Sequence, residues 1–503
     1  MNIQDAKEEI RNTLQAYLQK DEWGAYCYPV VRQRPLLLMG PPGVGKTAIV
    51  QQVARECGLP LVCYTMTHHT RQSAVGLPVI QKRTYCGREF SITEYTMSEI
   101  IGTVYRAMEQ TGKKEGILFL DEINCVSETL APTMLQFLQN KTFGNHTLPE
   151  GWVIIAAGNP PEYNKSVREF DIVTLDRIRN IQVEAQCAGF LEYGTGQGLH
   201  GAVLSYLKNK PERFYHVCRR ENSVSYVTAR GWEDLSRLLQ SYETLDIPVT
   251  EAVIGEFLRL EETCRDFYAY YRLYAKYGRE YAIEELLTGQ AESSVYADRV
   301  KLAAAGDFAE RFLVTNLVLE QLGREGRAYE KEDSQAVAVH ELLKSFLHGS
   351  DTLEEFLSAR KNALETKSRF QLLGGKELLQ EKNTLRLLEI WQQSGREARC
   401  REKAQWDSFL EQRFQELLEA RRCQVQRTGR ALSGAFGFIS DCFGDGQELL
   451  LLLTGITANP VLMDYIARHG CREYVACSRK LMCQQQEDEL RKKCLEAMKA
   501  EKS

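Results

Sequence analysis

Residues 36–47 read LLLMGPPGVGKT, and this stretch decides the fold of the chain. Leu36 to Met39 form an apolar run long enough for one buried strand of a parallel sheet. Residues 40–47 then follow the pattern G-x-x-x-x-G-K-T, and residues 48–54 (AIVQQVA) continue as a predicted helix. This strand–loop–helix order distinguishes a phosphate-binding loop from a chance match, so the sequence predicts that the chain binds a nucleoside triphosphate.

The residues of this loop have distinct predicted roles. Glycines let the backbone turn its N–H groups inward, where a polyphosphate meets them together with the N-terminus of the helix. Lys46 supplies a positive charge for the β- and γ-phosphates, and the Thr47 hydroxyl is placed to ligate Mg²⁺. A glycine-rich turn that binds nothing is the alternative, and it does not account for the full motif in this context. The predicted nucleotide-binding residues of the loop are Gly40, Pro41, Pro42, Gly43, Val44, Gly45, Lys46, Thr47 and Ala48.

A second apolar run, residues 116–120, ends in the carboxylates Asp121 and Glu122. Asp121 is predicted to hold the Mg²⁺ shell, and Glu122 is predicted to orient and deprotonate the attacking water. Two acids after an apolar run also fit the simple end of a strand. Behind a full phosphate loop, the chemical interpretation is favoured.

Three more apolar runs predict further strands, at residues 61–66, 152–158 and 179–183. Asn159 follows the second of them, where its side chain fits either a contact with the γ-phosphate and water or the capping of a turn. Strands that alternate with helices through short connections predict an α/β core: a parallel five-stranded sheet with helices on both faces and ligands at the carboxyl ends of the strands.

The pattern predicts four parts of the chain. Residues 1–33 are a helical lead-in, residues 34–185 the nucleotide-binding core, residues 186–290 a helical lid and residues 291–503 an all-α extension. In the core, residues 67–96 look like a polar and basic insertion, and residues 141–150 like a small hairpin. In the extension, residues 308–322 and 336–347 are predicted as helices, and residues 434–446 as a break rich in glycine and phenylalanine.

The net charge, the apolar stretches and the cysteines argue against several classes of protein. The net charge of -5 gives no global attraction to nucleic acid or to an anionic membrane, and no apolar stretch is long enough to span a bilayer. The fifteen cysteines include no C-x-x-C pair, which favours reduced thiols and a cytoplasmic protein over disulfides or zinc. We therefore expect neither a membrane nor a metal cluster.

Two segments are compatible with a nucleic-acid partner. Residues 267–277 (FYAYYRLYAKY) interleave aromatic and basic side chains, and residues 421–430 contain four arginines. A stacking platform usually accompanies a wider basic field, so a packed helix and a solvated helix face are the favoured interpretations. Nucleic acid is not expected as a partner.

Five motifs in one order, GPPGVGKT, FLDEIN, AAGNP, LDRI and TARGW, resemble those of the AAA+ ATPases, and more narrowly those of the MoxR and dynein-related branch. The resemblance covers about residues 30–260. It implies that Asn159 is the sensor 1 residue, Arg177 the arginine finger offered to a neighbouring subunit and Arg230 the sensor 2 residue. It also implies that residues 67–96 are an insert near the second core helix, and residues 141–150 a pre-sensor hairpin. Members usually work as ring hexamers that remodel proteins or insert metals as chaperones, often with a partner that carries a von Willebrand A domain.

Several points stay open. Arg168 and Arg179 lie close to Arg177 and are alternative fingers. The helical extension after residue 290 shows no resemblance that would identify the substrate. An ATP-driven remodelling enzyme acting on a protein client is the leading hypothesis, with Mg²⁺-ATP as the expected cofactor. A nucleic-acid motor or loader and a nucleotide-gated scaffold are the alternatives, although the intact acidic pair argues against the scaffold. No guanine-reading N-K-x-D motif occurs, so ATP is favoured over GTP mainly by the resemblance.

Overall fold

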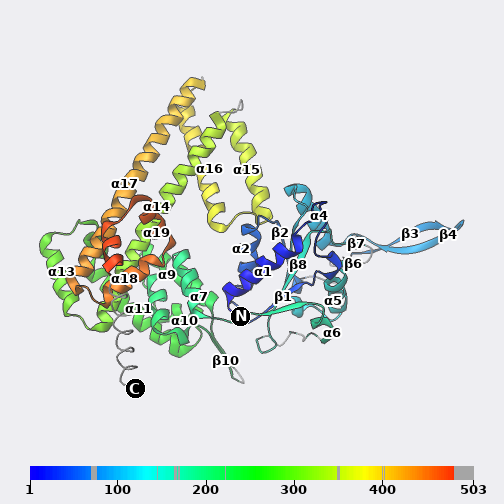
Figure 1. Ribbon diagram of the computed structural model, residues 1–503, viewed down its shortest axis with the longest axis horizontal. Helices are drawn as coiled ribbons and strands as arrows, with labels where there is room; N and C mark the ends of the chain where they lie inside the picture. The colour runs from blue at the N-terminus through cyan, green and yellow to red at the C-terminus, as the bar shows by residue number, and fades with distance from the viewer. Residues whose placement is uncertain are drawn as a thin grey trace, which may run out of the picture. The chain divides into compact units, whose positions relative to one another are not determined.

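The computed structural model describes residues 1–68, 76–143, 146–163, 167, 170, 172–220, 223–347, 352–398, 400 and 403–480 (Figure 1). The chain divides into two compact units. The first unit contains residues 1–189, 228–231 and 349–392, and the second contains residues 190–227, 232–348 and 393–503. The chain therefore passes between the two units several times.

A parallel five-stranded sheet, in the order β2-β5-β8-β1-β9, forms the centre of the first unit. The strands are β1 (Leu36–Met39), β2 (Leu61–Thr65), β5 (Gly116–Asp121), β8 (Trp152–Gly158) and β9 (Arg179–Gln182). These are the five apolar runs of the sequence, each within one residue of its predicted bounds. The predicted P-loop α/β core is confirmed.

Helices cover both faces of this sheet. Leu36 and Leu38 belong to one buried cluster, together with residues of α1 (Ile3–Leu18) and α2 (Lys46–Glu56). Leu37 belongs to a second cluster, with residues of α4 (Glu99–Thr111) and α5 (Ala131–Asn140). Strand side chains alternate between faces, so a strand buried on both sides is apolar throughout.

Two small antiparallel hairpins interrupt the core. Strands β3 (Pro78–Tyr85) and β4 (Arg88–Tyr95) lie in the predicted insertion, and Figure 1 shows this hairpin extending away from the sheet. Strands β6 (Thr142–Phe143) and β7 (His146–Thr147) form the hairpin predicted at residues 141–150. The remaining short elements are η1 (Val30–Arg32), η2 (Met66–His68), η3 (Ile123–Cys125) and α6 (Ile172–Leu175).

The first unit also contains a helical hairpin from far along the chain, α15 (Leu353–Arg369) and α16 (Gly375–Glu397). Phe370, between these helices, is 3% exposed and lies in the same buried cluster as Leu37 and Leu120. The expected boundary at residue 290 therefore does not separate the nucleotide-binding core from all later residues. The reason is the burial of an apolar loop that the local sequence pattern does not reveal.

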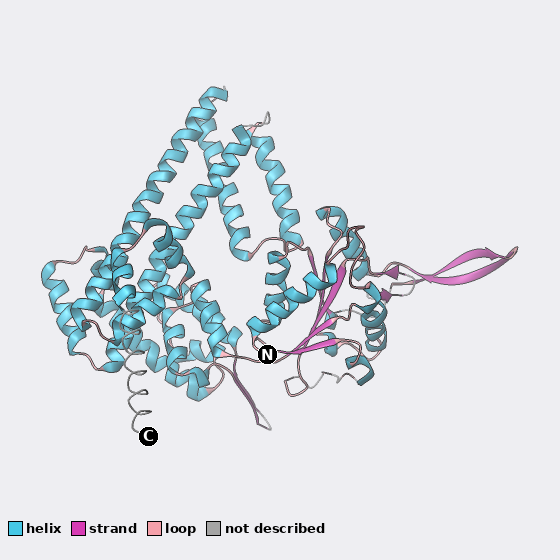
Figure 2. Cartoon of the chain, in the orientation of Figure 1, coloured by secondary structure: helices cyan, strands magenta, loops and turns pink. Residues whose placement is uncertain are grey.

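The second unit consists mainly of helices (Figure 2). Its longest helices, α14 and α17, have 40 and 41 residues and pack against each other. The helices are α7 (Cys187–Gln197), α8 (Gly201–Asn209), η4 (Pro211–Arg213), α9 (Ala229–Thr244), α10 (Glu251–Phe257), α11 (Glu261–Tyr281), α12 (Ile283–Thr288), α13 (Ser293–Ala305), α14 (Phe308–Leu347), α17 (Lys403–Phe443), α18 (Gln447–Thr457) and α19 (Pro460–His469).

Two expectations for this helical part are wrong. Within the predicted lid, β10 (His216–Arg220) and β11 (Ser223–Val227) form an antiparallel hairpin, in keeping with the strand preference of its β-branched valines. The predicted break at residues 434–446 lies largely inside α17. Gly434 does not break this helix but lets it pack closely against the backbone of a neighbouring segment. A Cβ at Gly434 would lie 2.3 Å from the carbonyl oxygen of Leu287, so glycine allows the helix to approach that backbone.

In the part of the chain that the structure describes, no single helix is long and apolar enough to cross a bilayer. Helices α18 and α19 meet the length and composition criteria only as a pair, and they are bent by 88°. Every described cysteine is free, and no three His, Cys, Asp or Glu side chains among the described residues are grouped as metal ligands.

Candidate nucleotide site

Strand register brings the predicted site residues to one edge of the sheet. Thr65 at the end of β2 pairs with Asp121 at the end of β5, and Met39 at the end of β1 pairs with Gly158 at the end of β8. Because all these strands run in parallel, the loops that follow them lie side by side. The motifs near residues 40, 121 and 159 therefore form one site.

The phosphate loop needs its glycines for both conformation and space. Gly43 and Gly45 have φ angles of +76° and +95°, in the left-handed region that favours glycine. At Gly40, a Cβ would lie 2.4 Å from the carbonyl oxygen of Val183. The loop leads directly into α2, whose first residue is Lys46, so the helix N-terminus faces the loop's interior.

Lys46 lies at the centre of the site and is 8% exposed. Its Nζ donates hydrogen bonds to the carbonyl oxygens of Gly40 and Pro41, at 2.8 and 2.9 Å, and to Oδ1 of Asn159 at 2.9 Å. Burial lowers the pKa of Lys46 from 10.5 to about 8, and the attraction of Asp121 opposes this only in part. The nearby carboxylates therefore do not fully compensate the positive charge of the ammonium, and phosphate oxygens would do so.

Thr47 and Asp121 form a second contact across the site. Oγ1 of Thr47 donates to Oδ2 of Asp121 at 2.8 Å, and the other carboxylate oxygen accepts from the backbone N–H of Glu122 at 3.0 Å. A hydroxyl and a carboxylate side by side are the oxygen ligands that Mg²⁺ uses beside nucleotide phosphates. These residues fit a magnesium–triphosphate complex.

Glu122 has an unusual backbone conformation. Its φ of +54° and ψ of +39° lie in the left-handed region, which is strained for a residue other than glycine. Its Oε2 accepts a hydrogen bond of 3.1 Å from Oγ1 of Thr67, which follows β2. The short helix η2, which follows the neighbouring strand β2, thus holds the carboxylate.

Asn159 is held in place by Asn124. The side-chain amide of Asn124 donates to the carbonyl oxygen of Asn159 at 2.8 Å and accepts from its N–H at 3.3 Å. Asn124 is 2% exposed, and a Cβ at Gly158 would lie 2.7 Å from its Oδ1. The sequence did not single out Asn124 or Thr67. The buried polar residue inside FLDEIN is a usable signal for Asn124, whereas the role of Thr67 depends on the pairing of β2 with β5.

The arginines occupy different places. A Cβ at Gly43 would lie 3.5 Å from Cβ of Arg230, so Arg230 lies beside the phosphate loop, where its charge also lowers the pKa of Lys46. Arg177 is exposed and donates to Oε1 of Gln139 at 2.6 Å. Among the described residues, no hydrogen bond or ion pair joins Arg177 to the other predicted site residues.

Arg179 and Arg168 are the alternative candidates for the arginine finger. Arg179 forms an ion pair with Glu9 and a 2.8 Å hydrogen bond to Oγ1 of Thr13 on α1. These intramolecular contacts occupy its guanidinium and disfavour it as a finger. Arg168 lies outside the described residues.

Residues 36–176 match the family "ATPase family associated with various cellular activities (AAA)". The chain contains an AAA ATPase domain. The chain is similar to the Lon protease of Fusobacterium nucleatum, at 28% identity over 151 residues, which is 29% of this chain and 17% of that protein. It is also similar to the ATPase family gene 2 protein homolog B of Rattus norvegicus, at 31% identity over 156 residues, or 28% of this chain and 18% of that protein.

The chain thus spans less than a fifth of the length of these curated relatives. One relative is named a protease and the other an ATPase family protein, so these short matches do not establish the activity of the whole protein. The family match and the ATPase-named relative support ATP hydrolysis by this domain. The narrower resemblance to the MoxR and dynein-related branch stays a prediction.

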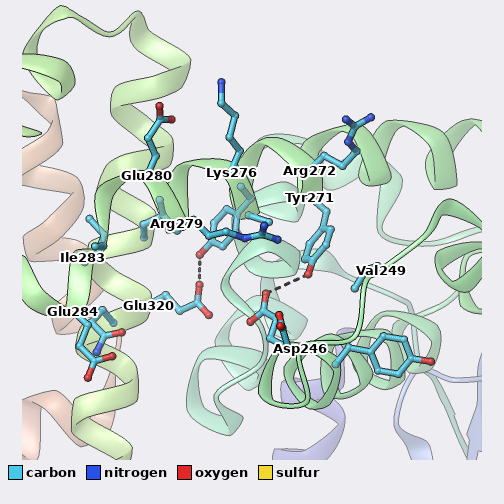
Figure 3. Close-up of a pocket in the computed structure, with 18 of the residues that line it drawn as sticks. Asp246, Val249, Tyr271, Arg272, Lys276, Arg279, Glu280, Ile283, Glu284 and Glu320 are labelled. Carbon is cyan, nitrogen blue, oxygen red and sulfur yellow. Dashed lines mark hydrogen bonds between the residues drawn. The ribbon is translucent and has the colours of Figure 1, made fainter.

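A cavity of about 1320 Å³ lies within the second unit, and none of its lining residues is a predicted site residue (Figure 3). Some of its lining residues belong to a polar network that also includes His200. His200, which is fully buried, bonds Glu243 at 2.9 Å, and Glu243 accepts from Tyr271 at 3.3 Å. Arg324 donates to Glu320 at 2.9 Å, and Glu320 also accepts from Tyr274. This network accounts for much of the aromatic run at residues 267–277 as helix packing.

Proposed function

We propose that the site hydrolyses ATP with a division of roles among residues of one subunit. Lys46 donates to the β- and γ-phosphate oxygens, and Arg230 adds a second positive charge beside the loop. Glu122 accepts a proton from the attacking water, which Asn159 orients toward the γ-phosphate. The bonds of Lys46 to Asn159 and of Thr47 to Asp121 carry this proposal, because they bring three separate motifs to one point.

Thr47 and Asp121 are the proposed ligands of Mg²⁺. When bound, the ion would neutralise charge on the β- and γ-phosphates. The 2.8 Å hydrogen bond between the two side chains supports the proposal, since it shows that their oxygens already lie close together.

We propose further that the active form is an oligomeric ring, a hexamer by analogy with the family. Arg177 is exposed and directed to Gln139, whereas Lys46 and Arg230 already supply the positive charge in the same subunit. An exposed arginine that follows the sensor strand is suited to a neighbouring subunit's γ-phosphate. We therefore assign Arg177 as the arginine finger.

The proposed role of this ring is that of a MoxR-like chaperone in the cytoplasm that remodels a protein client. A protein with a von Willebrand A domain is the first candidate for its partner. The two segments considered for nucleic-acid binding, residues 267–277 and 421–430, instead make contacts within the chain. Phe267, Tyr271 and Tyr274 are buried, and two of the clustered arginines pair with acids: Arg421 with Asp333, and Arg427 with Glu284 and Glu325.

Mixing two inactive variants tests the shared site. Arg177→Ala lacks the finger and Glu122→Gln lacks the base, so neither is expected to turn over alone. In mixed rings, some interfaces combine an intact Glu122 with an intact Arg177, and activity should return. An arginine finger contributes about 10³–10⁵ in rate. An Arg177→Ala protein with wild-type turnover, or a fully active monomer, would refute the shared site.

A further inference from the structure

The loop between α15 and α16 lies on the edge of the AAA sheet. Strand β2 is an edge strand, and its Leu61 N–H donates to the carbonyl oxygen of Phe370 at 3.2 Å. The Phe370 side chain is buried with residues of the sheet, and Leu372 packs against the same cluster. Edge strands expose unpaired backbone groups, so this loop, residues 370–374, covers the beginning of β2. We call it the edge loop.

The edge loop contacts more than one point of the AAA core. The Gln371 side chain interacts with the thiol of Cys63 in the middle of β2. A Cβ at Gly374 would lie 3.6 Å from Nε of Arg55 on α2. Gln371 has a φ of +53°, a left-handed conformation that is unfavourable for a residue other than glycine. Such a conformation persists where the surroundings hold it, which indicates a well-defined seat.

Strand β2 leads from the edge loop to the proposed base. Its last residue, Thr65, pairs with Asp121, and two residues later Thr67 donates to the carboxylate of Glu122 at 3.1 Å. The position of β2 therefore sets the position of Thr67. Because Glu122 is itself in a strained conformation, its carboxylate depends on such outside support.

The edge loop is also continuous with the second unit. The chain enters α15 from α14 and leaves α16 toward α17, the two longest helices of that unit. Ion pairs join the two arms of the hairpin, including Lys367 with Glu381 at 3.1 Å. These ion pairs hold the two arms together, and the loop between them lies on the strand that supports the base.

We propose that the edge loop positions Glu122 for hydrolysis by holding β2 and, through it, Thr67. Phe370 and Gln371 are then positioning residues, and the helical extension sets the rate of ATP hydrolysis through them. This inference rests on the proposed role of Glu122. It adds that part of the hydrolytic machinery lies more than two hundred residues beyond the base in the chain.

Removing the Phe370 anchor in the full-length chain tests the proposal. We expect Phe370→Ala to lower kcat on the order of tenfold, as for a misplaced general base, with nucleotide affinity and the number of binding sites unchanged. Phe370→Leu should restore most of the rate. Leu379→Ala on α16, where the side chain is 59% exposed, is the matched control and should leave kcat unchanged. A loop with only a structural role would instead reduce the number of binding sites at constant kcat per site.

A second variant guards against misfolding. Gln371→Gly removes the contact with Cys63 but suits the left-handed backbone, so the protein should fold at least as well and still lose turnover. Normal kcat in both Phe370→Ala and Gln371→Gly would overturn the proposal.

A double-mutant cycle tests the route through Thr67. If the edge loop acts through that residue, kcat of Thr67→Ala combined with Phe370→Ala should be no lower than that of Thr67→Ala alone. Independent, multiplying losses would overturn this route. Glu122→Gln separates the two levels of the argument: wild-type turnover in that variant would defeat the proposed function itself. An inactive Glu122→Gln, together with normal kcat in both Phe370→Ala and Gln371→Gly, would defeat only this inference.

Discussion

Lys46 should make nucleotide affinity depend on pH. Burial lowers its pKa to about 8, so at pH 7 about nine in ten nucleotide-free molecules carry the ammonium, and at pH 9 only about one in ten. Phosphate oxygens stabilise the ammonium, so the complex keeps its proton over this range. The nucleotide-free protein binds fewer protons than the complex above pH 8, and affinity must therefore fall as the pH rises.

From these fractions we expect the Kd of ADP or a non-hydrolysable ATP analogue to rise about tenfold between pH 7 and pH 9. Binding at pH 9 should take up nearly one proton. Calorimetric titrations in two buffers of different ionisation enthalpy measure both the Kd and the proton count. The titrations are done with Mg²⁺ in excess, because the bound ion lowers the last pKa of the terminal phosphate and keeps it ionised across this range.

Lys46→Arg provides the matched control, because a guanidinium stays charged throughout this range. That variant should bind with a Kd independent of pH, even if it binds more weakly. A wild-type Kd that is constant between pH 7 and pH 9 would refute the reasoning. So would an equal pH dependence in the Lys46→Arg variant.

Three further perturbations test the site and the helical unit. Glu122→Gln should keep nucleotide affinity within about twofold and lower kcat by about 10²–10⁴, measured by binding and phosphate release. Gly158→Ala should destabilise the protein by about 1–3 kcal/mol in chemical denaturation, because the new Cβ would clash with the Asn124 side chain. Gly102→Ala, on α4 where a Cβ has room, should instead stabilise the protein by about 0.5–1 kcal/mol. Burial lowers the pKa of His200, but Glu320 and Glu243 outweigh this effect, so the pKa lies above 6.5. The stability that the charged imidazole confers is therefore present below pH 6.5 and is lost as the pH rises through the folded pKa. His200→Gln should remove this pH dependence of the free energy of unfolding.

The sequence predicted the AAA core because its signals are local. Each central strand is buried on both faces and therefore appears as an uninterrupted apolar run, and the phosphate loop carries its glycines at fixed spacing. The acidic pair and Asn159 follow such runs directly. Parallel pairing then brings the strand ends together, so the position of these residues follows from topology.

Other features depend on contacts between distant residues and leave weaker local traces. Gly434 looks like a helix breaker in the sequence, yet it lies inside α17 because the backbone at Leu287 needs the space of its missing side chain. The sequence favours packing for the aromatic run at residues 267–277 but leaves nucleic-acid stacking open. The hydrogen bonds of Tyr271 and Tyr274 to Glu243 and Glu320 support packing. In both cases the deciding partner is remote in sequence.

The edge loop meets a need that the sheet topology creates. A parallel sheet with β2 at its border leaves backbone groups of that strand unpaired, so some segment must cover them or leave them to water. Nothing in the local sequence pattern of residues 370–374 marks this loop as the covering segment. What singles it out is the set of contacts to Leu61, Cys63 and Arg55, together with the strained backbone at Gln371. Because β2 also supports Thr67, a covering segment in this position acts on the hydrolytic base as well as on the fold.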